Sequence, residues 1–304
     1  MINLSTRITI NEWVFALGIY PSFNSQEKYE LFMEMVENYL ETQGYQGPKI
    51  EENKMKKLST KKKASFASFL KEINITEELM NYDTKGVKWI SLLSLDYPEQ
   101  LRQIYIPPVV LFYKGDLSLL SKHDWLGVTG TRNASKYGLD TTKLLVSSLL
   151  EESSHTLGIV SGLGEGIDTE AHQITLEMNG STIAVLGSGF DHYYPSVNRF
   201  LQENIEETSL VISEYPLGVK PLGYHFPERN RIIAGLSRGV LIIEAPKRSG
   251  SLITAYQAID ENRDLFVVPG SVINTNFEGS HRLIQLGGIL TQNSTDILKE
   301  WDYI

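Results

Sequence analysis

Residues 157–168 have the sequence LGIVSGLGEGID, in which an apolar run leads into three glycines at alternate positions. The run Leu157–Ser161 predicts a buried β-strand, and the amphipathic segment Thr169–Met178 after the glycines predicts a helix. The glycines permit backbone angles that other residues avoid, so the loop can turn bare N–H groups outward. Such groups beside a helix N-terminus favour an anion. The stretch therefore predicts a strand, an anion-binding loop and a helix.

Short apolar runs alternate with helix-length segments on both sides of this stretch. Each run is continuous in its apolar character, which is typical of strands in a parallel sheet covered by helices on both faces. The pattern predicts an α/β fold with an extended Rossmann-like parallel sheet. The other expected strands are Trp125–Val128, Thr182–Leu186, Leu210–Ser213, Gly239–Glu244 and Leu265–Val268, and the other expected helices are Gly138–Leu150, Val197–Glu206, Arg229–Leu236, Leu252–Glu261 and Ser280–Leu286.

The first third of the chain predicts helices instead. Apolar residues recur at three- and four-residue spacing in Glu27–Glu41 and again in Phe66–Ile73. The lysines between Lys54 and Lys63 are interpreted as a solvated loop and helix start, with an auxiliary DNA or partner surface as the alternative. The segment Ile90–Gly115 is expected to join the two parts and to add an edge strand. The expected domains are therefore residues 1–88, small and all-helical, and residues 89–304, Rossmann-like.

Composition and charge exclude several classes of protein. The 304 residues include no cysteine, which excludes disulfides and thiolate metal sites and favours the cytoplasm as compartment. We expect no membrane association, because no apolar run reaches the roughly 18 residues of a membrane span, and the N-terminus lacks the layout of a signal peptide. The net charge of −9 lies entirely in residues 91–304. A nucleic-acid site there needs its few cations gathered on one face.

Ligands of such a sheet bind beyond the carboxyl ends of the strands, so the loops at those ends are the candidate site. Thr131 and Arg132, after the first core strand, offer a hydroxyl and a guanidinium suited to phosphate oxygens. Gly130 is expected to let a ligand approach the backbone. The loop after Glu244 combines two cations with a Ser-Gly-Ser turn that opens a helix.

The segment 226–233, FPERNRII, places two arginines around an asparagine, directly after an aromatic residue. Aromatic faces beside guanidinium groups bind single-stranded nucleic acid through base stacking and phosphate contact. At least one arginine of this segment is expected to pair internally, for example with Glu228 or Glu244. The residues expected to contact DNA are Gly130, Thr131, Arg132, Ser161, Gly162, Gly164, Gly166, Phe226, Arg229, Asn230, Arg231, Lys247, Arg248, Ser249 and Gly250.

Motifs that would indicate an enzyme are missing from these loops. The glycine spacing differs from G-x-G-x-x-G, and the strand Thr182–Leu186 ends without the acidic residue that holds a ribose, so a dinucleotide cofactor is not expected. Asp168 is expected to cap the helix that begins at Thr169. His172 lies one turn further on, and a two-residue metal site made with Asp168 lacks other ligands. We expect no catalytic residue, no metal and no cofactor.

These motifs together resemble the DprA/Smf family of DNA-processing proteins. The match runs in order from about residue 90 to 290 and includes the segment 226–237, whose first eight residues, 226–233, are its most specific part. The resemblance implies a Rossmann fold that binds and protects single-stranded DNA without hydrolysing it during natural transformation and loads the RecA recombinase onto it. It also implies a homodimer joined through the Rossmann domain, and a helical domain of sterile-alpha-motif type at residues 1–88. The other matching stretches are Gly130–Arg132, Ser161–Asp168, Ala171–His172, Thr182–Gly187, Tyr194–Pro195, Ser213–Glu214, Glu244–Ala245, Ser249–Ala255 and Val268–Gly270.

The sequence also departs from the family pattern. Family members often have a basic residue at the position of Glu165 and a DNA-contacting lysine at that of Glu177. A carboxylate near a phosphate is unfavourable, and the candidates to compensate are Lys136, Lys143 and Lys247.

The sequence leaves two alternatives to DNA binding open. The first is a nucleotide-binding Rossmann enzyme similar to phosphoribohydrolases. Ser249–Thr254 stands at the place of their Pro-Gly-Gly-x-Gly-Thr loop, with no glutamate until Glu261. The second is a structural adaptor whose loops bind only a protein.

Overall fold

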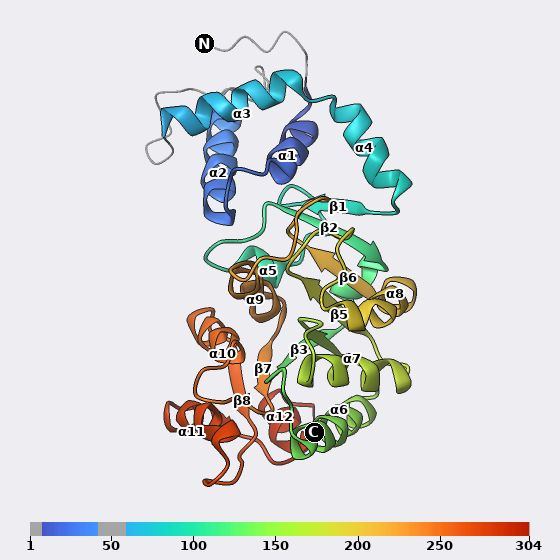
Figure 1. The fold of residues 1–304 in the computed structure, drawn as a ribbon, viewed down its shortest axis with the longest axis vertical. Helices are drawn as coiled ribbons and strands as arrows, with labels where there is room; N and C mark the ends of the chain where they lie inside the picture. The colour runs from blue at the N-terminus through green and yellow to red at the C-terminus, as the bar shows by residue number, and fades with distance from the viewer. Residues whose placement is uncertain (1–7, 42–58, 304) are drawn as a thin grey trace.

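A computed structural model describes residues 8–41 and 59–303, in which one mixed sheet forms the centre of the molecule (Figure 1). The strand order is β1-β2-β6-β5-β4-β3-β7-β8-β9. All neighbours from β6 to β9 are parallel, whereas β1 with β2 and β2 with β6 are antiparallel. The strands are β1 Lys88–Ser91, β2 Val110–Gly115, β3 Asp124–Thr129, β4 Leu157–Ser161, β5 Thr182–Leu186, β6 Leu210–Ser213, β7 Gly239–Ile242, β8 Asp264–Val267 and β9 Ile289–Leu290.

Helices cover both faces of the sheet (Figure 1). The face with α6, α7 and α8 is sealed by a core in which strand residues such as Leu126 and Phe266 meet Leu145 and Leu149 of α6. The opposite face carries α5, α9, α10 and α11, and α12 packs against α6. The helices of this part are α5 Glu99–Arg102, α6 Lys136–Glu152, α7 Ile167–Glu177, α8 Arg199–Thr208, α9 His225–Leu236, α10 Ser251–Asp260, α11 Glu278–Gln285 and α12 Ser294–Glu300, with short 3₁₀ helices η1 Leu117–Ser121, η2 Ser196–Asn198 and η3 Thr275–Phe277.

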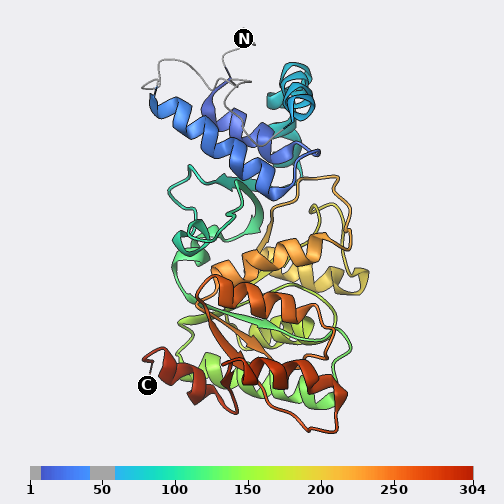
Figure 2. The ribbon, with the colours of Figure 1, turned by 90° about the vertical axis from the view of Figure 1, so that its left-hand side faces the viewer.

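The N-terminal helices lie against the β1–β2 end of the sheet (Figures 1 and 2). They are α1 Ile10–Ile19, α2 Ser25–Glu41, α3 Thr60–Glu72 and α4 Ile75–Thr84. Phe15 of α1 is fully buried, and its ring contacts those of Tyr82 and Phe112, the latter on β2. One apolar core is therefore continuous from α1 into the sheet. In the described part of the chain, no helix has the length and apolarity needed to cross a bilayer.

The predicted fold class, an extended Rossmann-like sheet after a helical N-terminal region, is confirmed. Three strands, β4, β5 and β6, have the predicted bounds. The segment expected to add one edge strand supplies two, and β2 lies inside the sheet between β1 and β6. The division into domains at residues 88 and 89 stays a prediction.

Strand order determines which loops become neighbours. Because β5, β4, β3 and β7 are adjacent and parallel, the loops that follow them line up in that order along one edge. These loops begin at Gly187, Gly162, Gly130 and Ile243. The fold thus brings together four chain segments far apart in sequence.

Candidate nucleic-acid interface

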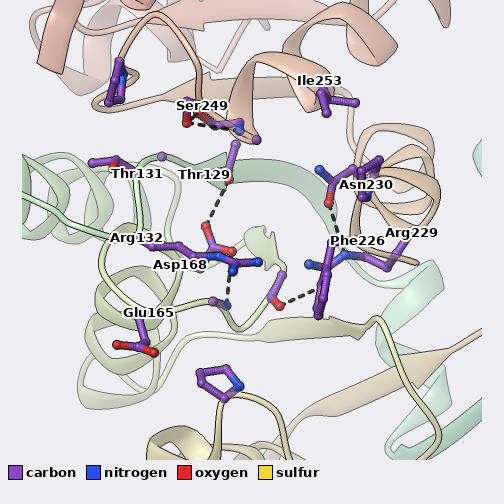
Figure 3. A pocket seen from close by; sticks show the side chains of 18 of the residues that line it. Thr129, Thr131, Arg132, Glu165, Asp168, Phe226, Arg229, Asn230, Ser249 and Ile253 are labelled. Carbon is purple, nitrogen blue, oxygen red and sulfur yellow. Dashed lines mark hydrogen bonds between the residues drawn. The ribbon is translucent and has the colours of Figure 1, made fainter. Parts of the chain in front are cut away.

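A cleft of about 360 Å³ opens at this edge, between the four loops and the first turn of α9 (Figure 3). It gathers eleven of the fifteen residues that the sequence indicated. These are Gly130, Thr131, Arg132, Gly162, Gly164, Phe226, Arg229, Asn230, Arg248, Ser249 and Gly250.

The ring of Phe226 lies close to two guanidinium groups. The guanidinium carbon of Arg132 is 5.2 Å from the ring centroid and that of Arg229 is 5.9 Å from it. Tyr194 adds a second ring, whose centroid is 5.1 Å from that of Phe226 at an interplanar angle of 37°. Arg132 and Tyr194 are exposed, so a cation and an aromatic face are both offered to a ligand.

Arg229 is buried and fixes the floor of the cleft. Its Nη1 donates to the carbonyl oxygens of Gly162, at 2.7 Å, and Val185. A Cβ at Gly162 would lie 2.6 Å from Nη2 of Arg229, so a larger residue there would displace the guanidinium. Burial lowers the pKa of Arg229 to about 10, against the opposing effect of Asp168. The group stays a cation at neutral pH and supplies a fixed positive charge to the cleft.

Asp168 does not cap a helix at Thr169, as the sequence predicted. Helix α7 begins at Ile167, and its N-cap is Gly166, whose φ of +76° suits glycine. The Asp168 carboxylate instead accepts hydrogen bonds from Thr129 Oγ1, at 3.0 Å, and from the Gly164 N–H, at 3.2 Å. Burial raises the pKa of this carboxyl group, against the effects of Arg229, these hydrogen bonds and Arg132. Asp168 therefore holds the glycine loop in shape.

His172 takes no part in the site. It is fully buried, and its Nδ1 lies 2.7 Å from Thr182 Oγ1. Burial and the nearby Arg229 lower its pKa to about 3, so its imidazole is neutral. Within residues 8–41 and 59–303, no group of three or more His, Asp or Glu side chains is placed to hold a metal ion.

Three of the glycine and serine residues that are expected to contact DNA also hold the fold together. Ser161 is buried, and its hydroxyl donates to the Val128 carbonyl at 2.6 Å. A Cβ on Gly166 would lie 2.5 Å from the Thr131 carbonyl oxygen. Gly130 lines the cleft, but a Cβ there would lie 2.5 Å from Cγ1 of Ile167. Gly130 thus also allows the β3 loop to pack closely on α7, and its expected role in ligand approach stays a prediction.

Arg231 points away from the cleft. Its Nη2 binds both oxygens of Glu214, at 2.8 and 2.7 Å, in a buried ion pair. The prediction that one arginine pairs internally is confirmed, but the partner is neither Glu228 nor Glu244. Glu244 accepts instead from the Ser135 N–H and hydroxyl and from Asn276. Sequence spacing could not show that residues 229 and 231 face opposite sides of α9.

The loop after β7 forms the opposite wall. Arg248 is exposed and lines the cleft beside Gly250, where a Cβ would meet no atom within 4 Å. Ser249 Oγ lies 2.7 Å from Ser251 Oγ at the start of α10. Lys247 is exposed on the same loop but does not line the cleft.

The structure shows where the two glutamates that depart from the family pattern lie. Glu165 is exposed and lines the cleft, where its carboxylate repels phosphate, whereas Glu177 lies at the far end of α7. None of the three lysines proposed to compensate lines the cleft, and Lys136 is paired with Asp140 at 2.5 Å. Of the lysine run, residues up to 58 lie outside the described residues, and Lys62 pairs with Glu27 at 2.5 Å.

Sequence reasoning did not select several lining residues. Tyr194 and Pro195 enter the cleft from the β5 loop, and Thr129 and Ile253 enter from the end of β3 and from α10. The Tyr-Pro pair after a glycine-containing strand end was the available signal. Both residues lie before the expected helix Val197–Glu206, and only the match to the family pointed to them.

Comparison with known proteins identifies the family. A family model described as DNA recombination-mediator protein A matches residues 88–302. The chain belongs to this family. The resemblance to DprA/Smf proteins predicted from the motifs is thereby confirmed.

The chain is similar to DprA proteins both in sequence and in solved structures. The DNA processing protein DprA of Streptococcus pneumoniae is 48% identical over 213 residues, which cover 70% of this chain and 74% of the relative. A solved structure of DprA from that organism matches 96% of this chain and 99% of its own, with a TM-score of 0.82 and 37% identity. DprA from Helicobacter pylori, solved to describe its mode of binding single-stranded DNA, matches 71% of this chain and 98% of its own, with a TM-score of 0.62 and 27% identity.

Proposed function

We propose that the protein binds single-stranded DNA in the cleft at the carboxyl edge of its sheet, without cleaving it. The observation that carries the proposal is Phe226, whose ring lies close to the guanidinium groups of Arg132 and Arg229 and next to Tyr194. Exposed bases stack on aromatic side chains, and guanidinium groups bind the phosphates between them. The relative from Helicobacter pylori is described as binding single-stranded DNA.

The form of the cleft favours a single strand over a duplex. Stacking on Phe226 and Tyr194 requires bases whose faces are free, which the bases inside a duplex lack. The polar groups around them, from Arg132, Arg248 and Ser249, contact phosphate and sugar and would therefore act on any sequence. Binding should be strong for oligothymidylate and weak for the matching duplex.

Membership of a recombination-mediator family leads to the wider proposal. The protein would protect single-stranded DNA in the cytoplasm and load a RecA-type recombinase onto it, as a homodimer joined through the Rossmann-like part. The test is filament assembly by purified recombinase on single-stranded DNA, with and without this protein, beside sedimentation of the protein alone. Faster assembly and a dimeric mass are expected. Unchanged assembly would restrict the function to binding and protection.

The alternative function to test is that of an enzyme that hydrolyses nucleotides. Asp168 is the carboxylate at the centre of the cleft (Figure 3), but Thr129 and Gly164 hold both its oxygens. Incubation with a panel of nucleoside monophosphates should release no base. The same samples, given labelled oligothymidylate, should return it at full length while binding it.

A further inference from the structure

Two exposed apolar side chains lie beside the cleft without a partner in the described part of the chain. Val197 of η2 is 70% exposed and Phe200 of α8 is 82% exposed. Residues three apart on a helical segment are neighbours on its surface, so together they form one apolar patch. Leu201 and Ile205 of the same helix face inward and belong to the core. The two residues of the patch are therefore not among those that hold α8 on the sheet.

This patch is held in a fixed position relative to the cleft. Asn198, between its two members, is buried, and its Nδ2 donates to the Leu163 carbonyl at 2.9 Å and to Thr169 Oγ1 at 2.7 Å. Leu163 belongs to the glycine loop, and Thr169 belongs to the first turns of α7. The side chain of Asn198 thereby fastens η2 to the floor of the DNA cleft.

The strand order places the patch directly after the last loop of the cleft. Along the carboxyl edge, the β7 loop supplies Arg248 and the neighbouring β3 loop supplies Arg132. The β4 loop then supplies the glycines and the β5 loop supplies Tyr194, and η2 and α8 follow the β5 loop. Four neighbouring strands are about 14 Å across, from a spacing of about 4.8 Å. Bases stacked at about 3.4 Å would fill that length with about four nucleotides.

We propose that Val197 and Phe200 form a second base-stacking subsite, which takes nucleotides of the same DNA strand after it leaves the cleft past Tyr194. This inference rests on the proposed function. The occupant is a base because the patch is aromatic and apolar, and because it continues a surface on which the rings of Tyr194 and Phe226 already lie. Arg199 lies in the same segment, with its guanidinium carbon 4.8 Å from the ring centroid of Tyr193, but its Nε already donates to Glu203 Oε1 at 2.8 Å. The apolar patch, and not this cation, therefore carries the proposal.

The test measures binding of oligothymidylates of about four and about twelve nucleotides by competition anisotropy. Phe200→Ala should leave the affinity for the short oligonucleotide unchanged and weaken that for the long one at least fivefold, since stacking contributes about 1–3 kcal/mol per base. Tyr105→Ala is the matched control, because Tyr105 is an aromatic residue with 79% exposure on another segment. That variant should bind both lengths as the wild type does.

Failure of this inference differs from failure of the proposed function. Arg132→Ala should weaken both lengths; if it weakens neither, the cleft itself is not the DNA site. If Arg132→Ala weakens both lengths while Phe200→Ala binds the long oligonucleotide as the wild type does, the second subsite is overturned. Loss of recombinase binding in that Phe200→Ala variant would then assign the patch to a protein. As an independent readout, the fluorescence of Phe200→Trp should be quenched by the long oligonucleotide and not by the short one.

Discussion

The guanidinium of Arg132 lies over the ring of Phe226, with 5.2 Å between the guanidinium carbon and the ring centroid. One residue comes from the loop after β3 and the other from the first turn of α9. The pair thus joins two loops of the cleft and places a cation and an aromatic ring beside the same ligand. Its energetic value, about 0.5–1 kcal/mol at an exposed site, is small enough that either residue can be changed without unfolding the protein.

Phe226→Ala should weaken binding of oligothymidylate about 5- to 150-fold, because it removes a stacking platform worth about 1–3 kcal/mol. Phe226→Tyr retains the ring and should stay within a few-fold of the wild type. Anisotropy at a single salt concentration measures both. Equal affinity in Phe226→Ala would show that no base stacks there.

Glu165→Lys should strengthen DNA binding, because it replaces a carboxylate on the rim of the cleft with a cation. The slope of log affinity against log salt should steepen by about 0.7 if the new lysine meets one phosphate. Glu177→Lys makes the same charge change outside the cleft. Equal gains in both variants would indicate a general charge effect and not a local contact.

Arg231→Met should destabilise the fold without acting on the cleft. It leaves the buried Glu214 carboxylate without its ion-pair partner, at a cost of about 3–5 kcal/mol in the free energy of unfolding. Replacing both residues, in Glu214→Met with Arg231→Met, should recover much of that loss. Urea unfolding measures stability, and DNA affinity at low temperature should change less than twofold.

His172→Gln should make the free energy of unfolding depend less on pH. The folded-state pKa of about 3 lies below the ordinary 6.5, so between these values the unfolded state binds more protons. The free energy of unfolding therefore falls as pH decreases through this window, by up to about 1.4 kcal/mol per pH unit. The comparison is wild type against variant in urea at pH 7.5 and pH 5. A stability difference that does not change with pH would mean that His172 titrates normally in the folded protein.

The sheet could be predicted from the sequence because its strands are continuous apolar runs ending in glycine or polar loops. Periodicity identified β4, β5 and β6 with their bounds, and the strand-end rule placed Arg132, Phe226 and Ser249 in one site. The short β9, of two residues, gives too little pattern to detect. The edge strand β1 has only four residues, and β2 begins two residues after Pro108, so this segment has the pattern of a connector.

The misassigned site residues have two physical causes, the rotation of one helix and the start of another. Whether Arg229 or Arg231 enters the cleft depends on the rotation of α9, and that rotation is set by Ile232 and Ile233 packing in the core. Asp168 was assigned as a cap because the helix start was placed two residues late. The positive φ of Gly166, which starts α7 early, is invisible in the sequence.

The most direct test of DNA binding in this cleft is a salt titration of Arg132→Ala against Arg238→Ala, with labelled oligothymidylate. Both arginines are exposed and lie over an aromatic ring, Arg238 over Trp301 at 5.1 Å, but Arg238 precedes β7 at the opposite edge of the sheet. Arg132→Ala should bind at least tenfold more weakly, with a salt slope shallower by about 0.7, while Arg238→Ala matches the wild type. Equal behaviour of the two variants would contradict the account.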